Sequence, residues 1–478
     1  MNQPRSFTKY LLVITLLALL MGSILPVSPI FAAGQQANRA ETDETGRTIE
    51  PATDVIAIAT GGSPINEYYP QVAFGDDYYM VAYYYLNSST TNPAFEVDVA
   101  VFNNQGQREI THIINNQAAH GTLSIAYHAP TGLFLLAYTS PNFPSSDFNV
   151  YYTAVSPITG RVGDIFQIPG ASDDDDLYPS VACAQTSDTC LLAFERNGSK
   201  ILGRYIALNS AGIVPPSFPS SFIYKLTDKD GQRPYITWGK DSGYYLLAYT
   251  RTETTVTPNV QYPVFTHVYD SNPGNIVLFA YAHDAVDAGD FTGMPNDKWA
   301  TGVAYDPCTQ KFVLLWDYYN YTNGDVAFSM VDKTAATVHA MGWIADTGKN
   351  ESSGDISFVT DDSLTAACGL MDKLVVTYAE TETGTYRINA AEVQGNSTVV
   401  NSSYTVAPTS DHLLVYESAD TIPNKAISIS NGSSLWEMFV AFDYFSPSSL
   451  TYDIFGRIIR APEEQDESNY IFLPLLMR

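Results

Sequence analysis

Carboxylate, tyrosine and arginine side chains recur where short apolar runs of the sequence end. Several lie one or two positions after the aromatic residue that closes such a run, and they are Arg196, Arg251, Asp317, Tyr318, Glu380, Asp443 and Tyr444. Aromatic faces combined with charged hydrogen-bonding groups suit a sugar or an extended peptide. We therefore predict a ligand-binding site built from these residues. The alternative is that the tyrosines at the run ends only pack on one another.

Acidic side chains precede several of the same apolar runs. The residues that we assign to a candidate cation site are Asp173, Asp175, Asp228 and Asp230. Carboxylate oxygens of this kind suit Ca²⁺. No EF-hand spacing is present, however, and acidic loops are commonly just solvated. Calcium is therefore the cofactor that the sequence suggests, with solvated loops as the alternative.

Other reactive residue types show no spacing that is typical of catalysis. The 7 His are scattered, without a His-Glu-x-x-His, Gly-x-Ser-x-Gly or phosphate-loop motif. Glycoside hydrolysis generally needs two carboxylates at the ligand, yet runs such as PQVAF (70–74) and PSVAC (179–183) carry no acid. We assign no catalytic residue and favour a binding or scaffold protein. The alternative is a glycan-cleaving enzyme on the same scaffold.

A repeated hairpin must position all these side chains. Its clearest copies are PQVAFGDDYYMVAY (70–83), LSIAYHAPTGLFLLAY (123–138), PSVACAQTSDTCLLAF (179–194) and PYITWGKDSGYYLLAY (234–249), and weaker copies cover 302–316, 356–378 and 427–442. Each copy has two apolar runs around a turn rich in Gly, Asp, Ser or Asn, which predicts a buried β-hairpin. A third strand and a less regular fourth follow. Four strands per repeat indicate the blades of a β-propeller.

The predicted fold is all-β, a single seven-bladed β-propeller over residues 53–460. The last repeat lacks a fourth strand, and DVIAIAT (54–60) precedes the first hairpin as a fourth strand would. Pairing of these two ends would remove two exposed sheet edges and close the ring. An open array or two smaller propellers is the alternative, and six or eight blades would follow if the 400–430 region is misinterpreted.

The 4 Cys permit two disulfides in an oxidising compartment. Cys183 and Cys190 occupy hairpin positions that are aromatic in other repeats and should face each other, so we predict that they form a disulfide. Cys308 and Cys368 fall in equivalent turns of adjacent repeats, which suggests a second disulfide between blades. The cysteine spacing does not match that of a zinc site.

The repeats resemble a family of secreted bacterial propeller repeats with a Pro-x-Val-Ala…Leu-Leu-Ala-Tyr…Asp-Ile-Phe-Gly-Arg pattern. Residues 70–74, 134–138 and 453–457 carry the resemblance. It implies a scaffold and names no activity. The last residues, YIFLPLLMR (470–478), are similar to a C-terminal tail of exported bacterial proteins that is associated with sorting or surface retention. A final strand docked on the propeller is the alternative.

The N-terminal sequence predicts export. Arg5 and Lys9, an apolar run over 10–20 and Ala32-Ala33 have the three-part layout of a signal peptide, which we assign to residues 1–32. Residues 33–52 follow as a linker, and 461–478 form an acidic linker and the tail. The net charge of −27 disfavours nucleic acid and anionic lipid as partners. We expect a secreted or cell-surface monomer whose partner is a glycan or an extracellular protein.

Overall fold

The computed structural model shows only β-strands, turns and loops in the part of the chain that it describes. The described residues are 50–60, 65–87, 94–115, 122–141, 147–170, 174–215, 223–227, 230–239, 243–253, 260–269, 283–284, 297–307, 309–320, 323–332, 338–358, 373–382, 384–395, 404–406, 412–418, 426–432, 437–446 and 451–460. The chain divides into two units, residues 1–44 and 45–478, and the described residues belong to the second. The predicted signal peptide and C-terminal tail lie outside them.

Antiparallel pairing of neighbouring strands groups the described strands into seven sheets. Three sheets from the first half contain β3 (Ile65–Gly75), β4 (Tyr78–Asn87), β5 (Ala94–Asn103) and β6 (Arg108–Asn115); β7 (Leu123–His128), β8 (Leu133–Pro141), β9 (Phe148–Ser156) and β10 (Gly160–Gln167); and β11 (Asp176–Cys183), β12 (Thr189–Arg196), β13 (Lys200–Asn209), β14 (Gly212–Ile213) and β15 (Tyr224–Lys225). In each sheet the first two strands are the predicted hairpin, and the third pairs with the second.

The remaining sheets repeat this order. They contain β16 (Gln232–Gly239), β17 (Tyr244–Glu253), β18 (Val260–Tyr269) and β19 (His283–Asp284); β20 (Asp297–Asp306), β21 (Lys311–Asn320), β22 (Asn323–Asp332) and β23 (Val338–Ala345); β24 (Asn350–Phe358), β25 (Lys373–Glu382), β26 (Thr385–Gly395), β27 (Tyr404–Val406) and β28 (Leu413–Ser418); and β29 (Ile427–Asn431), β30 (Glu437–Ser446) and β31 (Thr451–Arg460) with β1 (Glu50–Pro51) and β2 (Ile56–Ala59).

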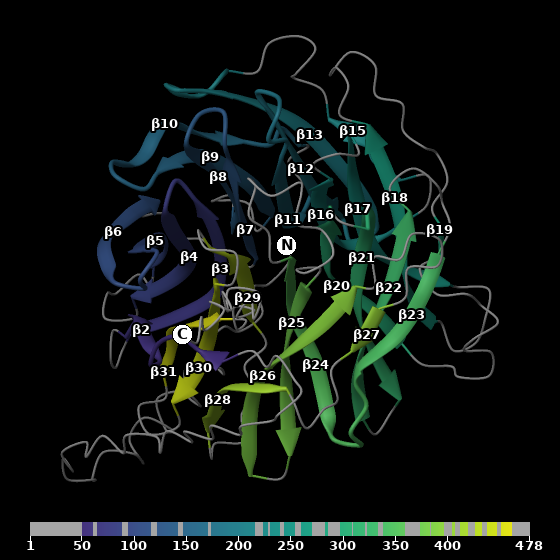
Figure 1. The fold of residues 1–478 in the computed structure, drawn as a ribbon. Helices are drawn as coiled ribbons and strands as arrows, with labels where there is room; N and C mark the ends of the chain where they lie inside the picture. The colour runs from purple at the N-terminus through teal and green to yellow at the C-terminus, as the bar shows by residue number, and fades with distance from the viewer. Residues whose placement is uncertain are drawn as a thin grey trace, which may run out of the picture. The chain divides into compact units, whose positions relative to one another are not determined.

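The two ends of the described chain meet in the last of these sheets. Strand β2 pairs antiparallel with β31, with Ile56 opposite Gly456, and β1 pairs with the end of the same strand. Ile58 of β2 is fully buried in a cluster with Ile454 and Ile458. The pairing predicted between residues 54–60 and the last repeat is therefore present. In Figure 1 the purple β2 lies beside the yellow β31.

The first strands of successive sheets contact one another in chain order. The contacting pairs are β3 with β7, β7 with β11, β11 with β16, β16 with β20, β20 with β24, β24 with β29, and β29 with β3. Antiparallel sheets of four or five strands, with their first strands at a common centre, are the architecture of a β-propeller (Figure 1). The predicted fold class, an all-β propeller, is confirmed.

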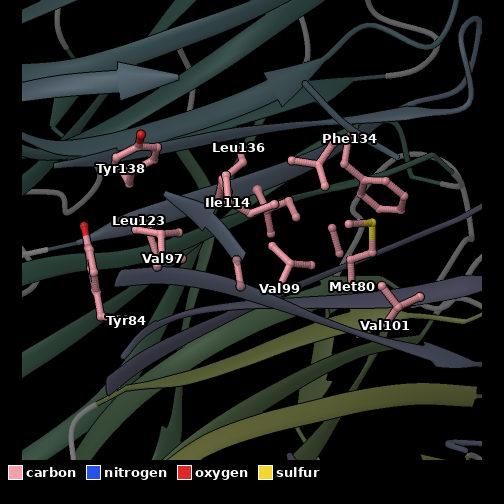
Figure 2. Close-up of a cluster of buried hydrophobic side chains, with 14 residues drawn as sticks. Met80, Tyr84, Val97, Val99, Val101, Ile114, Leu123, Phe134, Leu136 and Tyr138 are labelled. Atoms are coloured by element: carbon pink, nitrogen blue, oxygen red, sulfur yellow. The ribbon is translucent and has the colours of Figure 1, made fainter. Parts of the chain in front are cut away.

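The core lies between the faces of neighbouring sheets. Figure 2 shows one such layer, in which Met80 and Val99 of one sheet pack with Phe134 and Leu136 of the next. These side chains are fully buried. Complete burial of one such side chain contributes about 1.5–3 kcal/mol, so each blade depends on its neighbour to cover an apolar face.

The hairpin register predicted from the cysteines is confirmed. Cys183 lies directly opposite Cys190, and the two form a disulfide with a Cα–Cα distance of 3.9 Å. Aromatic pairs occupy the same place in other hairpins, with ring centroids 4.8 Å apart for Phe74 and Tyr79 and for Trp238 and Tyr245. The third sheet thus replaces an aromatic pair with a disulfide. The predicted bridge between residues 308 and 368 lies outside the described residues.

Candidate functional site

A cavity of about 570 Å³ lies where the first strands of the sheets meet. Its wall is formed by Tyr69, Gln71, Thr122, Leu123, Ser124, Phe148, Leu177, Tyr178, Pro179, Ser180, Arg233, Pro234, Tyr235, Thr301, Gly354, Asp355, Ala426 and Ile427. The volume is in the range of pockets that hold small molecules. A folded protein is too large to enter it, so its occupant would be a small molecule or the end of a chain.

Three of the first strands carry the same irregularity at this cavity. Tyr69, Tyr178 and Arg233 each precede a proline, and each has a left-handed backbone with φ of 53°, 51° and 50°. Pairing with the second strand shifts register at each of these points. Proline has no N–H for the ladder and therefore sits at bulges. Each bulge brings a tyrosine or an arginine to the cavity wall.

Side chains from the preceding sheet hold two of these three bulges, those at Tyr69 and Arg233. The backbone N–H of Arg233 donates to Oε2 of Glu195 at 2.9 Å, and that of Tyr69 donates to Oδ2 of Asp443 at 3.5 Å. Each acid directly follows an aromatic residue in the second strand of its sheet, Phe194 or Phe442. Left-handed backbone at a non-glycine residue costs about 1–3 kcal/mol and persists only where its surroundings fix it. These inter-sheet hydrogen bonds supply that constraint.

The guanidinium group of Arg233 is held by aromatic rings. Its central carbon lies 4.6 Å from the ring centroid of Trp299 and 5.5 Å from that of Tyr178. Arg233 is exposed, whereas both rings are half-buried. Among the described residues the guanidinium makes no ion pair. The cavity wall therefore carries a positive charge that forms no ion pair within the described chain, although it acts on the carboxylate of Glu195.

Two further polar groups face the cavity. Burial raises the pKa of Tyr235 to about 12, so its hydroxyl stays protonated at ordinary pH and can donate a hydrogen bond. Burial raises the pKa of Asp355 to about 6, against the opposing effect of donors from Ile356, Ser428 and Ile429. Its Oδ2 accepts hydrogen bonds from the Ser428 hydroxyl at 3.1 Å and from the Ile429 N–H at 3.2 Å. Asp355 thus places a carboxyl group of raised pKa on an innermost strand.

None of the seven residues predicted to bind ligand is part of the cavity wall. Asp317 and Asp443 lie directly behind it. Asp443 is buried and accepts the bulge N–H of Tyr69, while Asp317 accepts a hydrogen bond from the Tyr319 hydroxyl at 3.3 Å. The negative charge of Asp317 also contributes to the raised pKa of Tyr235. Asp443 therefore holds a residue of the cavity wall by a hydrogen bond, whereas Asp317 acts on the wall only through its charge on Tyr235.

Three of the other predicted ligand-binding residues, Arg196, Tyr318 and Glu380, contact side chains of their own sheets, whereas Tyr444 also contacts the preceding sheet. Arg196 forms a bidentate pair with Asp176 at 2.6 and 2.7 Å, and Glu380 pairs with Lys349 at 2.8 Å. Tyr318 packs edge-on against Trp343. Tyr444 packs against Tyr416 and Phe455, and Arg251 is half-buried. A direct role of these residues in binding stays a prediction.

The predicted calcium site is described only in part, since residues 173 and 228 lie outside the described chain. Oδ1 of Asp175 accepts the Phe148 N–H at 2.9 Å, and Asp230 is exposed. No cluster of three or more His, Cys, Asp or Glu that could hold a metal ion occurs among the described residues. Calcium binding therefore stays a prediction.

Sequence analysis missed the residues that line the cavity. A sequence signal is present in three of the four clear hairpins. In these three, a tyrosine or arginine directly precedes the proline that begins the hairpin (69–70, 178–179 and 233–234). The sequence pattern does not indicate Asp355, because the apolar run of its repeat, ISFVT (356–360), begins one position after it. That position belongs to the strand, directly after a register shift.

Comparison with known proteins gives neither a family nor a curated relative, because no family model and no curated protein matches the chain. Solved structures do align. They include the β-propeller domain of the Trilobed protease from Pyrococcus furiosus (10% identity, 87% of this chain and 100% of that chain, TM-score 0.43). Another is the GH93 alpha-L-arabinofuranosidase of Fusarium graminearum (12%, 87% and 98%, 0.44), and a third is the periplasmic gluconolactonase PpgL of Pseudomonas aeruginosa (10%, 74% and 94%, 0.46).

These similarities are too low to carry an activity across. The class of the protein rests on its own strand pairing and on the contacts between its first strands, which define a β-propeller with a cavity at the centre of its sheets. In the part of the chain that the structure describes, no helix is long and apolar enough to span a membrane.

Proposed function

We propose that this protein is an exported binding propeller that holds a glycan, or the end of an extended peptide, at its central cavity. The observation that carries the proposal is the set of left-handed bulges that bring Tyr69, Tyr178 and Arg233 to the cavity wall. A strained backbone that is repeated at one place in the fold is typical of a functional site. Aromatic faces beside hydrogen-bonding groups suit sugar rings and extended chains.

The scaffold that we propose is a closed ring of seven blades, one for each sheet, completed by the pairing of β2 with β31. Support comes from the unbroken series of first-strand contacts and from the shared sheet of the two chain ends. The Cys183–Cys190 disulfide supports an oxidising, extracellular location.

A glycan-cleaving enzyme is the second candidate, and Asp355 is the observation that favours it. A carboxyl group with a pKa of about 6 is suited to general acid catalysis near neutral pH. A second carboxylate at the ligand is generally required. Asp317 is the nearby candidate, since the charges of both acids act on Tyr235. Hydrolysis of array ligands that stops in the Asp355→Asn variant would establish this alternative.

The proposal is tested by probing glycan and peptide arrays with the purified protein, with Ca²⁺ and with a chelator. Tyr178→Ala should weaken binding to array ligands about tenfold or more, because a stacking face is lost. The matched control is Tyr151→Ala, a half-buried tyrosine of β9 that is not part of the cavity wall. Equal binding by wild type and Tyr178→Ala to every array ligand would overturn the cavity as the binding site.

A further inference from the structure

The arginines of the described chain differ in what their guanidinium groups contact. Arg196, Arg387 and Arg460 form ion pairs with carboxylates, and Arg457 donates to backbone carbonyl oxygens. Arg233 does neither in the described chain. Its guanidinium packs on Trp299 and Tyr178 at the cavity wall, and its own backbone is fixed by Glu195.

This arrangement is unusual in a protein of this charge. The sequence contains 51 Asp and Glu against 24 Lys and Arg, so acidic side chains outnumber basic ones by about two to one. A solvent-accessible arginine could readily be paired, yet the guanidinium of Arg233 forms no ion pair with a described carboxylate, although its charge acts on Glu195. Stacking on two rings orients the plane of the guanidinium and reduces the entropy lost when a ligand binds to its donors.

We propose that Arg233 binds a carboxylate group of the ligand, and that the ligand is therefore an acidic glycan. This inference rests on the proposed function of the cavity. A guanidinium group matches a carboxylate through two parallel N–H donors, which gives both affinity and orientation. The half-buried Tyr178 and the exposed Tyr69 also line the cavity, and their aromatic surface suits a sugar ring. A uronic acid residue combines these two features in one unit.

The neighbouring acids sharpen the selectivity. Asp355 also lines the cavity, and Asp317 lies behind it. An anionic ligand must therefore place its charge at Arg233 and its hydroxyl groups toward Asp355. A ligand with several adjacent charges would meet repulsion from these acids, so the site should select one carboxylate rather than a dense run of negative charge.

The experiment compares two forms of one disaccharide, a galacturonic acid unit linked to a neutral galactose and the methyl ester of the same compound, by calorimetry or surface plasmon resonance. The ester has the same ring shape without the charge. Wild-type protein should bind the acid about tenfold to a hundredfold more tightly than the ester, as expected for a charge-assisted hydrogen-bonded pair. Arg233→Gln should remove this preference while leaving weak binding of the ester through the rings.

The matched control is Arg108→Gln. Arg108 is also exposed, but it lies on β6 and donates to Thr111 outside the cavity wall. This variant should keep the preference for the acid. Melting temperature and circular dichroism of both variants should match wild type, which separates a lost contact from a lost fold.

The outcomes distinguish the two proposals. If acid and ester bind equally and Tyr178→Ala weakens both, the cavity binds sugars but the inference about Arg233 is wrong. If neither form binds while acidic peptides do, with sensitivity to Arg233→Gln, the ligand is a peptide and the glycan assignment is overturned. If no array ligand responds to Tyr178→Ala, the proposed function itself fails, and the inference fails with it.

Discussion

The carboxylate of Asp443 in β30 accepts a hydrogen bond from the backbone N–H of Tyr69 in β3, across 374 positions of sequence. Oδ1 of the same side chain accepts the N–H of Ala426 at 3.4 Å. One buried acid thus joins the last sheet to the first and also holds a bulge at the cavity wall. Glu195 has the same relationship to Arg233 between two other sheets. Such acids connect the stability of the scaffold to the geometry of the candidate site.

The first prediction concerns the pH dependence of this contact. Burial raises the pKa of Asp443 to about 7 in the folded protein, above the ordinary value of 3.8. Between these values the folded state holds a proton that the unfolded state has released. The contribution of Asp443 to stability is therefore full below about pH 4 and is lost as the pH rises through about 7. The difference in free energy of unfolding between wild type and Asp443→Asn, measured by urea unfolding at several pH values, should show this loss.

A second substitution of Asp443 tests how much its hydrogen bonds contribute to stability. Asp443→Ala removes the side-chain acceptor of two N–H groups, those of Tyr69 and Ala426, which should cost about 1 kcal/mol for each. Asp188→Asn, at an exposed position, is the control and should leave the pH dependence of wild type unchanged. A difference between wild type and Asp443→Asn that stays constant from pH 4 to pH 8 would contradict the assignment.

The second prediction concerns the pairing of the chain ends. Deletion of residues 33–60 would expose the edge of β31, and we expect aggregation or strong destabilisation. A milder test is Ile58→Ala, which should cost about 2–5 kcal/mol because Ile58 is fully buried. The control Val55→Ala removes an exposed side chain of the same segment and should have little effect. A deletion variant that melts like wild type would rule out the closed ring.

The hairpins were predictable because their information is local. Cys183 and Cys190, like Phe74 and Tyr79, face each other across a short turn, so their register follows from the spacing of apolar residues. The pairing of β2 with β31 followed from counting strands in each repeat. Both arguments need only the repeat pattern and the rule that sheet edges must be covered.

The cavity was not predictable because its geometry depends on contacts between sheets. In sequence, an Xaa-Pro pair at the start of an apolar run predicts only a strand boundary. The left-handed backbone of Arg233 depends on a hydrogen bond to Glu195 of another repeat, which the local sequence does not indicate. The predicted ligand-binding residues were placed by repeat position alone. Period-two alternation directs Asp443 toward Tyr69 of the first sheet, and Tyr444 toward Phe455 of its own sheet and Tyr416 of the preceding sheet.

The third prediction concerns the disulfides. Replacing both Cys183 and Cys190 with Ala should lower the free energy of unfolding by about 2–3 kcal/mol, since the bridge closes only a short loop. Reduction of the wild-type protein should have an effect of the same size. Peptide mapping without reductant should recover Cys183 linked to Cys190, and we expect Cys308 linked to Cys368. A crossed pairing would refute the second assignment.

The last prediction concerns the strain at the cavity wall. Tyr178 has a φ of 51°, a conformation that costs an ordinary L-residue roughly 1–2 kcal/mol and costs glycine almost nothing. Tyr178→Gly and Tyr178→Ala both remove the ring, so the difference between them measures the backbone alone. We expect the glycine variant to be more stable than the alanine variant by about 1 kcal/mol. Urea unfolding of the pair is the measurement.

The same pair of substitutions at Tyr151 provides the reference, because this tyrosine lies in β9 and does not have a positive φ. There, alanine should be the more stable variant by about 0.5–1 kcal/mol, since glycine loses more conformational entropy in a strand. Both Tyr178 variants should bind array ligands weakly, because each lacks the stacking face beside Arg233. If glycine and alanine rank alike at the two positions, the bulge is unstrained. The cavity would then have been shaped by ordinary strand geometry, and the structural argument for a built binding site would fail.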